Sequence, residues 1–152
     1  MFDAITATAR EPHWYVEGAV PDTIDGRFAV LATITALVLV RFDQLGDAGT
    51  AASVAVTERF IEVMESEHRQ LGLGDPTLGK TVRRLVGSLG RRNQLWRLAA
   101  VGERDWNEAA LESLYKDAVS ADALLHSAQW LAAFWTKIQC VDVEGLEAGR
   151  LQ

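Results

Sequence analysis

The most apolar stretch of the chain runs from Phe28 to Val40 and contains no charged residue. Large apolar side chains recur there, and onward to Leu45, at spacings of three and four, and apolar residues also occupy the other faces. A helix that is apolar on nearly every face is surrounded by protein. The pattern therefore predicts a buried central helix over about residues 27–45. Its uncharged run is shorter than the roughly 20 residues that a membrane-spanning helix needs.

Weaker amphipathic patterns predict further helices around this central one. Asp105 and Ser120 are placed to cap the last two of them, and Asp75 to cap the helix that Pro76 opens. Residues 141–152 give only weak signals. No run of alternating strands and helices is present, so we predict an all-α fold, with a single compact multi-helix domain over residues 1–152. The further helices are expected at about 51–71, 76–101, 106–117 and 120–139.

Three glycines, Gly79, Gly87 and Gly90, lie inside the predicted helix 76–101. Each costs about 1 kcal/mol relative to alanine in a helix interior. We expect a break in the helix near Gly87 to Gly90, and we explain the glycines by the close approach of a neighbouring helix.

The chain is acidic, with a formal net charge of −6 and a pI near 5.0. This balance disfavours DNA as a partner, because phosphate backbones favour net positive surfaces. The single cysteine, Cys140, excludes an intrachain disulfide and is interpreted as a small buried hydrophobic residue. The first ten residues lack the basic start and apolar block of an export signal, so we expect a location inside the cell.

Residues 74–81 read G-D-P-T-L-G-K-T and satisfy the phosphate-loop pattern G-x-x-x-x-G-K-[ST]. A phosphate loop needs a buried strand that leads into a tight turn at the start of a helix. The segment before residue 74 has helical spacing instead, and its four glutamates would repel phosphate. We therefore interpret residues 74–81 as a connection between helices. A small nucleotide-binding enzyme is the alternative that the bare motif leaves open.

Positive charge is concentrated between Pro76 and Gly102, where no acidic residue occurs. At 100° per residue, apolar residues gather on one side of this helix and four cations on the other. We predict that these four form a basic strip that docks on an anionic surface, such as lipid headgroups, ribosomal RNA or an acidic protein patch. The alternative is a solvated face that pairs with Glu and Asp of neighbouring helices. The basic strip consists of Lys80, Arg83, Arg84 and Arg91.

Groups that could carry catalysis are scattered along the chain. His13, His68 and His126 have no partner at metal-ligand spacing, and Cys140 has no second thiol. The glutamates around residue 65 match a solvated helix face. The sequence therefore predicts no catalytic residue, no metal site, no cofactor and no enzymatic activity.

Two motifs and a dipeptide resemble a known family in combination. They are V-P-D-T-I-D-G-R-F from Val20 to Phe28, L-G-L-G-D-P-T-L-G-K from Leu71 to Lys80, and Gly90-Arg91. Over about residues 14–98 the chain resembles the ubiquinol-cytochrome c chaperone family of Cbp3-like assembly factors. The positions that match the family pattern are Asp22, Gly26, Arg27, Phe28, Gly72, Gly74, Asp75, Gly79, Lys80 and Arg91.

The resemblance implies a helical, non-enzymatic assembly factor that binds nascent or newly inserted cytochrome b and helps to build the respiratory bc1 complex. It also implies the ribosome or the membrane surface, and a small partner assembly protein, as further partners. The expected location is the cytoplasm, where the protein is bound peripherally to the inner face of the membrane. The alternative that rests on the basic strip alone is a helical adaptor that docks on anionic lipid or RNA without a cytochrome client.

Overall fold

The computed structural model describes residues 1–151, which contain α-helices and one 3-10 turn but no β-strand. This confirms the predicted all-α fold. In the described range, no helix is both long enough and apolar enough to span a membrane. The elements in chain order are α1 (Phe2–Ala9), η1 (Pro12–Trp14), α2 (Ile24–Gln44), α3 (Asp47–Gln70), α4 (Asp75–Ala100), α5 (Trp106–Leu114), α6 (Ala121–Gln139) and α7 (Val143–Glu147).

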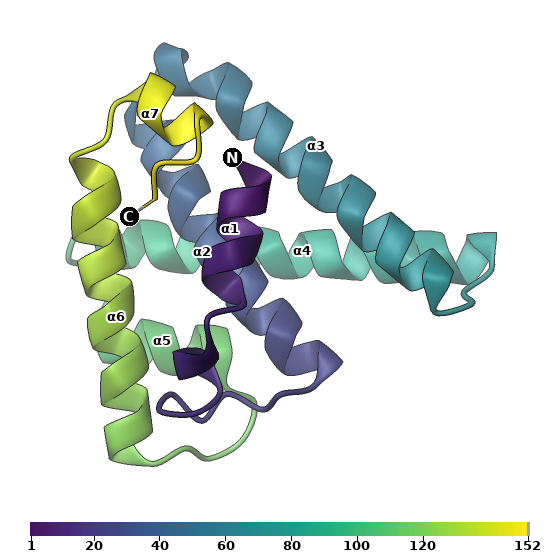
Figure 1. Cartoon of the computed structure of the whole chain (residues 1–152), viewed down its shortest axis with the longest axis horizontal. Helices are drawn as coiled ribbons and strands as arrows, with labels where there is room; N and C mark the ends of the chain where they lie inside the picture. The colour runs from purple at the N-terminus through teal and green to yellow at the C-terminus, as the bar shows by residue number, and fades with distance from the viewer. Residues whose placement is uncertain (152) are drawn as a thin grey trace.

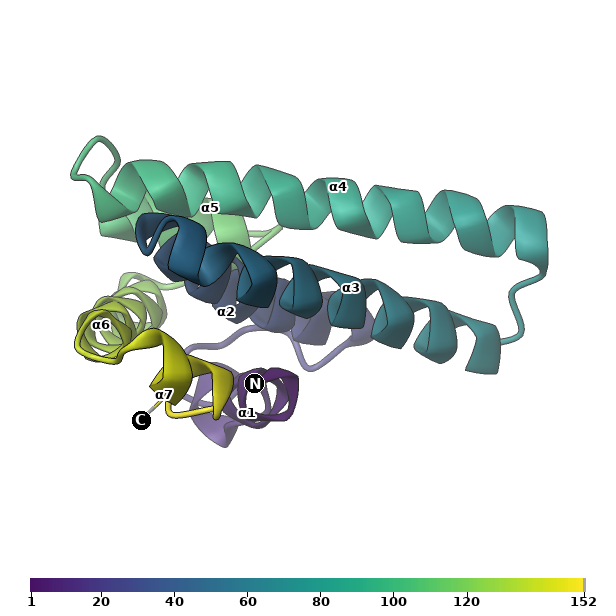
Figure 2. The same ribbon diagram turned by 90° about the horizontal axis from the view of Figure 1, so that it is seen from above.

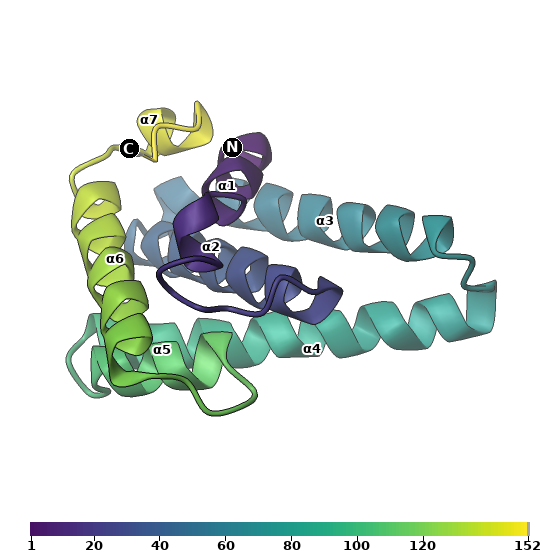
Figure 3. The ribbon, with the colours of Figure 1, turned by 60° about the horizontal axis from the view of Figure 1, so that its bottom comes forward.

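Helix α2 is the central element, as its apolar pattern predicted. Helices α1, α3, α4, α5 and α6 all pack against it (Figures 1 and 3). Ile34, Leu37 and Phe42 on different faces of α2 have no exposed surface. Because these side chains are enclosed on every side, burial of apolar surface on α2 is a main source of stability for the fold.

The helices form layers, with α4 as the outermost element on one side of the molecule (Figure 2). Helices α2 and α3 lie beneath it, and α1, α6 and α7 lie on the opposite side. Helices α3 and α4 form an antiparallel pair, and the connection between them lies at the far end of the molecule (Figures 1 and 2). One complete face of α4 is therefore left uncovered by other helices.

Side-chain caps fix several helix starts. The Asp105 carboxylate accepts a hydrogen bond from the Glu108 N–H (3.1 Å), and the Ser120 hydroxyl accepts one from the Ala123 N–H (3.2 Å), which confirms both predicted caps. The predicted cap at Asp75 is wrong by one residue. Gly74 is the N-cap, and Asp75 lies in the first turn of α4, where its charge stabilises the positive end of the helix dipole.

The predicted break in α4 is also wrong, because the helix is continuous through Gly87 and Gly90. Its apolar face, which includes Leu85, Leu89 and Trp96, is buried against the rest of the protein. This packing outweighs the cost of about 1 kcal/mol for each glycine.

Three short elements, the end of one helix and the exposure of Cys140 differ from the sequence-based expectations. Neither α1, η1 nor α7 was predicted, and α7 lies in a tail that gave only weak signals. The helix predicted over 106–117 ends at Leu114, since Tyr115 has extended backbone angles. Cys140 is exposed at the end of α6, so its interpretation as a buried hydrophobic residue is wrong.

Candidate functional site

The first family motif builds the start of α2. The Thr23 hydroxyl accepts a hydrogen bond from the Gly26 N–H (3.1 Å), and Arg27 Nε donates to Asp22 (2.7 Å) in an exposed ion pair. Gly26 is buried, and a Cβ atom there would lie 1.8 Å from the carbonyl oxygen of Pro21. Glycine is therefore required at this position because the chain folds back against its own backbone.

Phe28, the last residue of this motif, connects three helices. Its ring lies 6.1 Å from the ring of Phe60 on α3, and the Arg92 guanidinium of α4 lies 5.7 Å from its centre. Arg92 donates to the carbonyl oxygen of Ser113 (2.8 and 3.1 Å) and to Ser88. Burial, and to a smaller extent the neighbouring Arg91, lowers the pKa of Arg92 below its usual value.

Arg92 thus has a structural role that the sequence analysis did not predict, although it left this residue out of the basic strip. Its Cα lies about 120° around the helix from that of Lys80, between the basic and the apolar faces. This angular position was the signal in the sequence that Arg92 differs from the four cations of the strip. Ser113 gave no signal, yet its hydroxyl accepts from Trp96 Nε1 (3.0 Å) and lies 2.6 Å from the Thr33 hydroxyl in a buried network.

Tyr115 holds the loop that precedes the first motif. Its hydroxyl donates to the carbonyl oxygen of Gly18 (2.6 Å) and lies 2.7 Å from the Ser127 hydroxyl. Burial raises the pKa of Tyr115, and the hydrogen bond with Ser127 opposes this change. The loop is therefore fixed between α5 and α6 before it enters α2.

The second motif lies elsewhere, at the connection between α3 and α4. Gly72 has a φ of 87°, which favours glycine, and Gly79, Lys80 and Thr81 are already inside α4. A helix, not a strand, leads into the motif, so the amide groups of residues 79–81 are used within the helix and do not form a phosphate cradle. The interpretation that residues 74–81 do not form a phosphate loop is therefore confirmed. The connection between the helices is shorter than predicted, because it spans residues 71–74, and residues 75–81 are the first two turns of α4.

The basic strip of Lys80, Arg83, Arg84 and Arg91 lies on the exposed face of α4. None of the four makes an ion pair or hydrogen bond within residues 1–151. Arg84 lies near Asp25, whose pKa is lowered mainly by Lys116 and to a lesser extent by Arg84. Within residues 1–151 the strip therefore has no ion pair with a neighbouring helix, and Asp25 of α2 interacts with Arg84 only at longer range.

The glycines of α4 are not explained by a neighbouring helix. A Cβ atom at Gly79 or Gly87 would meet only an arginine side chain of α4 itself, at 3.6 Å, and one at Gly90 would meet nothing within 4 Å. The expected close approach is therefore absent. Because glycine has no side chain, nothing projects from the uncovered face of α4 at these positions.

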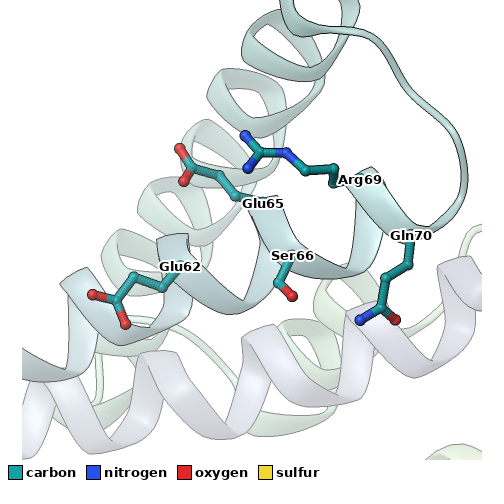
Figure 4. Close-up of a pocket in the computed structure, with 5 residues that line it drawn as sticks. All are labelled: Glu62, Glu65, Ser66, Arg69 and Gln70. Carbon is teal, nitrogen blue, oxygen red and sulfur yellow. The ribbon is translucent and has the colours of Figure 1, made fainter.

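The exposed side of α3 carries a shallow hollow of about 430 Å³ (Figure 4). Two carboxylates and one guanidinium border it, and all its lining residues come from one helix. Figure 4 shows no convergence of these groups on a single point, as a catalytic site would require. The lining residues are Glu62, Glu65, Ser66, Arg69 and Gln70.

The fold brings together two histidines that the sequence analysis treated as scattered. His13 Nδ1 lies 3.0 Å from His126 Nε2, and the His13 ring stacks on Trp130 at 5.0 Å. Burial is the main cause that lowers the pKa of His13; the nearby His126 adds to this effect, and Glu11 opposes it. Across residues 1–151, no group of three or more metal-ligating side chains is close enough together to hold a metal ion.

The protein is therefore all-α, and its two motifs lie at the starts of α2 and α4. The exposed faces of α3 and α4 are charged. The family profile described as ubiquinol-cytochrome C chaperone matches residues 17–151, and the chain belongs to this family. The match includes the C-terminal third, which lay outside the resemblance found from the motifs.

A solved structure has the same fold. It is the crystal structure of the Cbp3 homolog from Brucella abortus, with a TM-score of 0.82 and 23% sequence identity, covering 97% of this chain and 83% of that chain. None of the curated proteins compared with the sequence matches it.

Proposed function

We propose that this protein is an assembly chaperone of the bc1 complex that binds newly synthesised cytochrome b. The observation that carries the proposal is its membership of the ubiquinol-cytochrome c chaperone family over residues 17–151. The shared fold with the Cbp3 homolog supports the same class. The proposal treats residues 1–152 as one helical domain without catalytic activity.

The charge distribution supports a role beside a membrane-protein client. Helix α4 carries six cations and one acid, a net charge of +5, so the rest of the chain carries −11 against a total of −6. The inner loops of membrane proteins are rich in Lys and Arg. In this proposal the acidic surface of the chaperone meets those loops, and the exposed carboxylates of Glu58, Glu62 and Glu65 on α3 are candidates for the contact.

The proposed location is the cytoplasm, at the inner face of the membrane, where cytochrome b is inserted. The basic strip then faces the membrane or the ribosome, and a small second assembly protein completes the machinery. The roles of the motif residues at the start of α2 and at the α3–α4 connection are, in this proposal, to hold the helices that present these surfaces.

Deletion of the gene tests the proposal through the amount of assembled bc1 complex. We expect the complex and its cytochrome b to decrease, while a respiratory complex without cytochrome b stays unchanged. Photocrosslinking from the α3 acidic face should then recover cytochrome b, and photocrosslinking from the exposed Cys140 at the end of α6 should recover less. Undiminished bc1 assembly in the deletion strain would reject the proposed function.

The second candidate is a helical adaptor that uses the basic strip without a cytochrome client. The absence of ion pairs on the strip favours it. The two candidates differ in the deletion strain, because an adaptor without this client leaves bc1 assembly intact.

A further inference from the structure

The uncovered face of α4 joins the basic strip to an aliphatic end. At 100° per residue, the Cα atoms of Lys80, Arg84, Arg91 and Leu98 fall within a sector of about 40°. They extend over about 27 Å of the helix axis. Leu98 and Val101 are exposed to 42% and 61%. The cations and Leu98 therefore share one side of α4, and Val101 directly follows the end of the helix.

This face gathers four exposed cations that make no ion pair within the described part of the chain. Several exposed cations elsewhere pair with carboxylates, as in Arg59 with Glu62 (3.0 Å) and Arg104 with Glu112 (2.7 Å), whereas Arg10 after α1 and Lys137 in α6 are unpaired but are single cations on their elements. The basic strip has no such neighbours within ion-pair distance. Four cations without an ion-pair partner on one helix face attract an anionic partner by charge complementarity.

The position of α4 decides which kind of partner can reach the strip. Because α4 is the outermost helix on its side of the molecule, an extended flat surface can approach it along most of its length, up to the loop that follows its last turn (Figure 2). Gly87 and Gly90 place no side chain between the cations that flank them. A planar partner therefore meets the charges without obstruction.

We propose that α4 docks on an anionic lipid surface, with its axis parallel to the membrane. The basic strip contacts lipid phosphates, and Leu98 and Val101 enter the interface between headgroups and acyl chains, where burial of aliphatic surface is favourable. This deepens the proposed function, on which it rests, by assigning the membrane-facing side of the chaperone.

The same face is poorly suited to single-stranded RNA. Bases stack on exposed aromatic side chains in such complexes. The aromatic residue of α4, Trp96, has no exposed surface. Exposed leucine and valine gain free energy in a lipid interface and little from phosphates or bases.

Sedimentation of the purified chain with vesicles tests the proposal. Wild-type protein should bind vesicles of phosphatidylcholine and phosphatidylglycerol in equal amounts, but not phosphatidylcholine alone. Each cation at an anionic surface changes the partition coefficient about fivefold, so Arg84→Gln with Arg91→Gln should lower it about thirtyfold. The reversal Arg84→Glu with Arg91→Glu should lower it further.

A charge-matched control is available on the other side of the molecule. Arg10→Glu with Lys137→Glu changes the net charge as much as the α4 reversal does, but both positions follow or lie in helices of the opposite layer (Figure 2). This variant should keep most of the binding. Circular dichroism and thermal unfolding of each variant separate loss of binding from loss of fold, and the glutamine variant serves if the reversal does not fold.

Three results would overturn the membrane assignment: no binding to anionic vesicles, equal losses in the α4 and control variants, or binding to RNA in the absence of vesicle binding. None of these results bears on bc1 assembly in the deletion strain. A chaperone whose vesicle test fails but whose deletion lowers bc1 assembly keeps the proposed function and loses only this surface.

Discussion

Two glycine-to-alanine substitutions should change stability in opposite directions. Gly26 lies at the start of α2, where a Cβ atom would come within 1.8 Å of the Pro21 carbonyl oxygen and 2.9 Å of its carbon. Gly90 lies in the middle of α4, where a Cβ atom would meet nothing within 4 Å. The same chemical change therefore meets backbone in one case and open space in the other.

The magnitudes follow from what each substitution displaces. In Gly26→Ala the segment around Pro21 has to move, which breaks the hydrogen bond from the Gly26 N–H to Thr23, and loss of such a cap alone costs about 1 kcal/mol. Val20 is 2% exposed and moves with this segment, so we expect a loss of about 2–3 kcal/mol in the free energy of unfolding. Gly90→Ala should gain about 1 kcal/mol from helix propensity.

Urea unfolding and thermal unfolding, both followed by far-UV circular dichroism, measure the two effects. In a chain of this size, about 1 kcal/mol corresponds to a shift in Tm of about 2–4 °C, so the two variants should lie on either side of the wild type. The reasoning is refuted if Gly26→Ala is as stable as the wild type. It is equally refuted if Gly90→Ala lowers stability, since that would mean α4 is not continuous and exposed at this point.

Two further predictions concern buried polar groups. Ser113→Ala removes the acceptor of the Trp96 N–H and should lower the free energy of unfolding by about 1–3 kcal/mol, whereas the exposed Thr136→Ala, measured in the same urea titration, should change it little. Burial holds the pKa of His13 below its ordinary value of 6.5, so the unfolded chain binds more protons there. Stability should therefore fall as the pH drops below 6.5, and this pH dependence should weaken in His13→Gln; a pH profile identical to that of the wild type would contradict the role of His13.

The surface charge of α4 could be predicted only in part from the sequence. The helical period placed Lys80 and Arg91 on one side and the apolar residues on the other, and the structure confirms this separation. The period alone did not show whether carboxylates of other helices neutralise the strip. The formation of ion pairs depends on where the other helices lie. In the structure, no carboxylate of those helices is close enough to the basic strip for an ion pair.

Helices with strong local signals could be predicted from the amino-acid sequence alone. The apolar run of α2, and the caps at Asp105 and Ser120, depend on residues within a few positions of one another, so periodicity and capping chemistry were sufficient. The phosphate loop at residues 74–81 was excluded correctly for the same reason, because the helical spacing before it excludes a strand, although most of this segment belongs to α4 and not to the connection. The family motifs were equally local.

The short elements and the long-range contacts depend instead on how the helices pack together. Helix α7 is too short to form alone, and the burial of Leu146 and Leu151 in the core stabilises it. Helix α4 stays continuous through its glycines because the opposite face is packed. The pairing of His13 with His126, 113 residues apart, depends on how α6 lies beside η1. No local pattern encodes such contacts, since they arise when distant apolar surfaces are buried together.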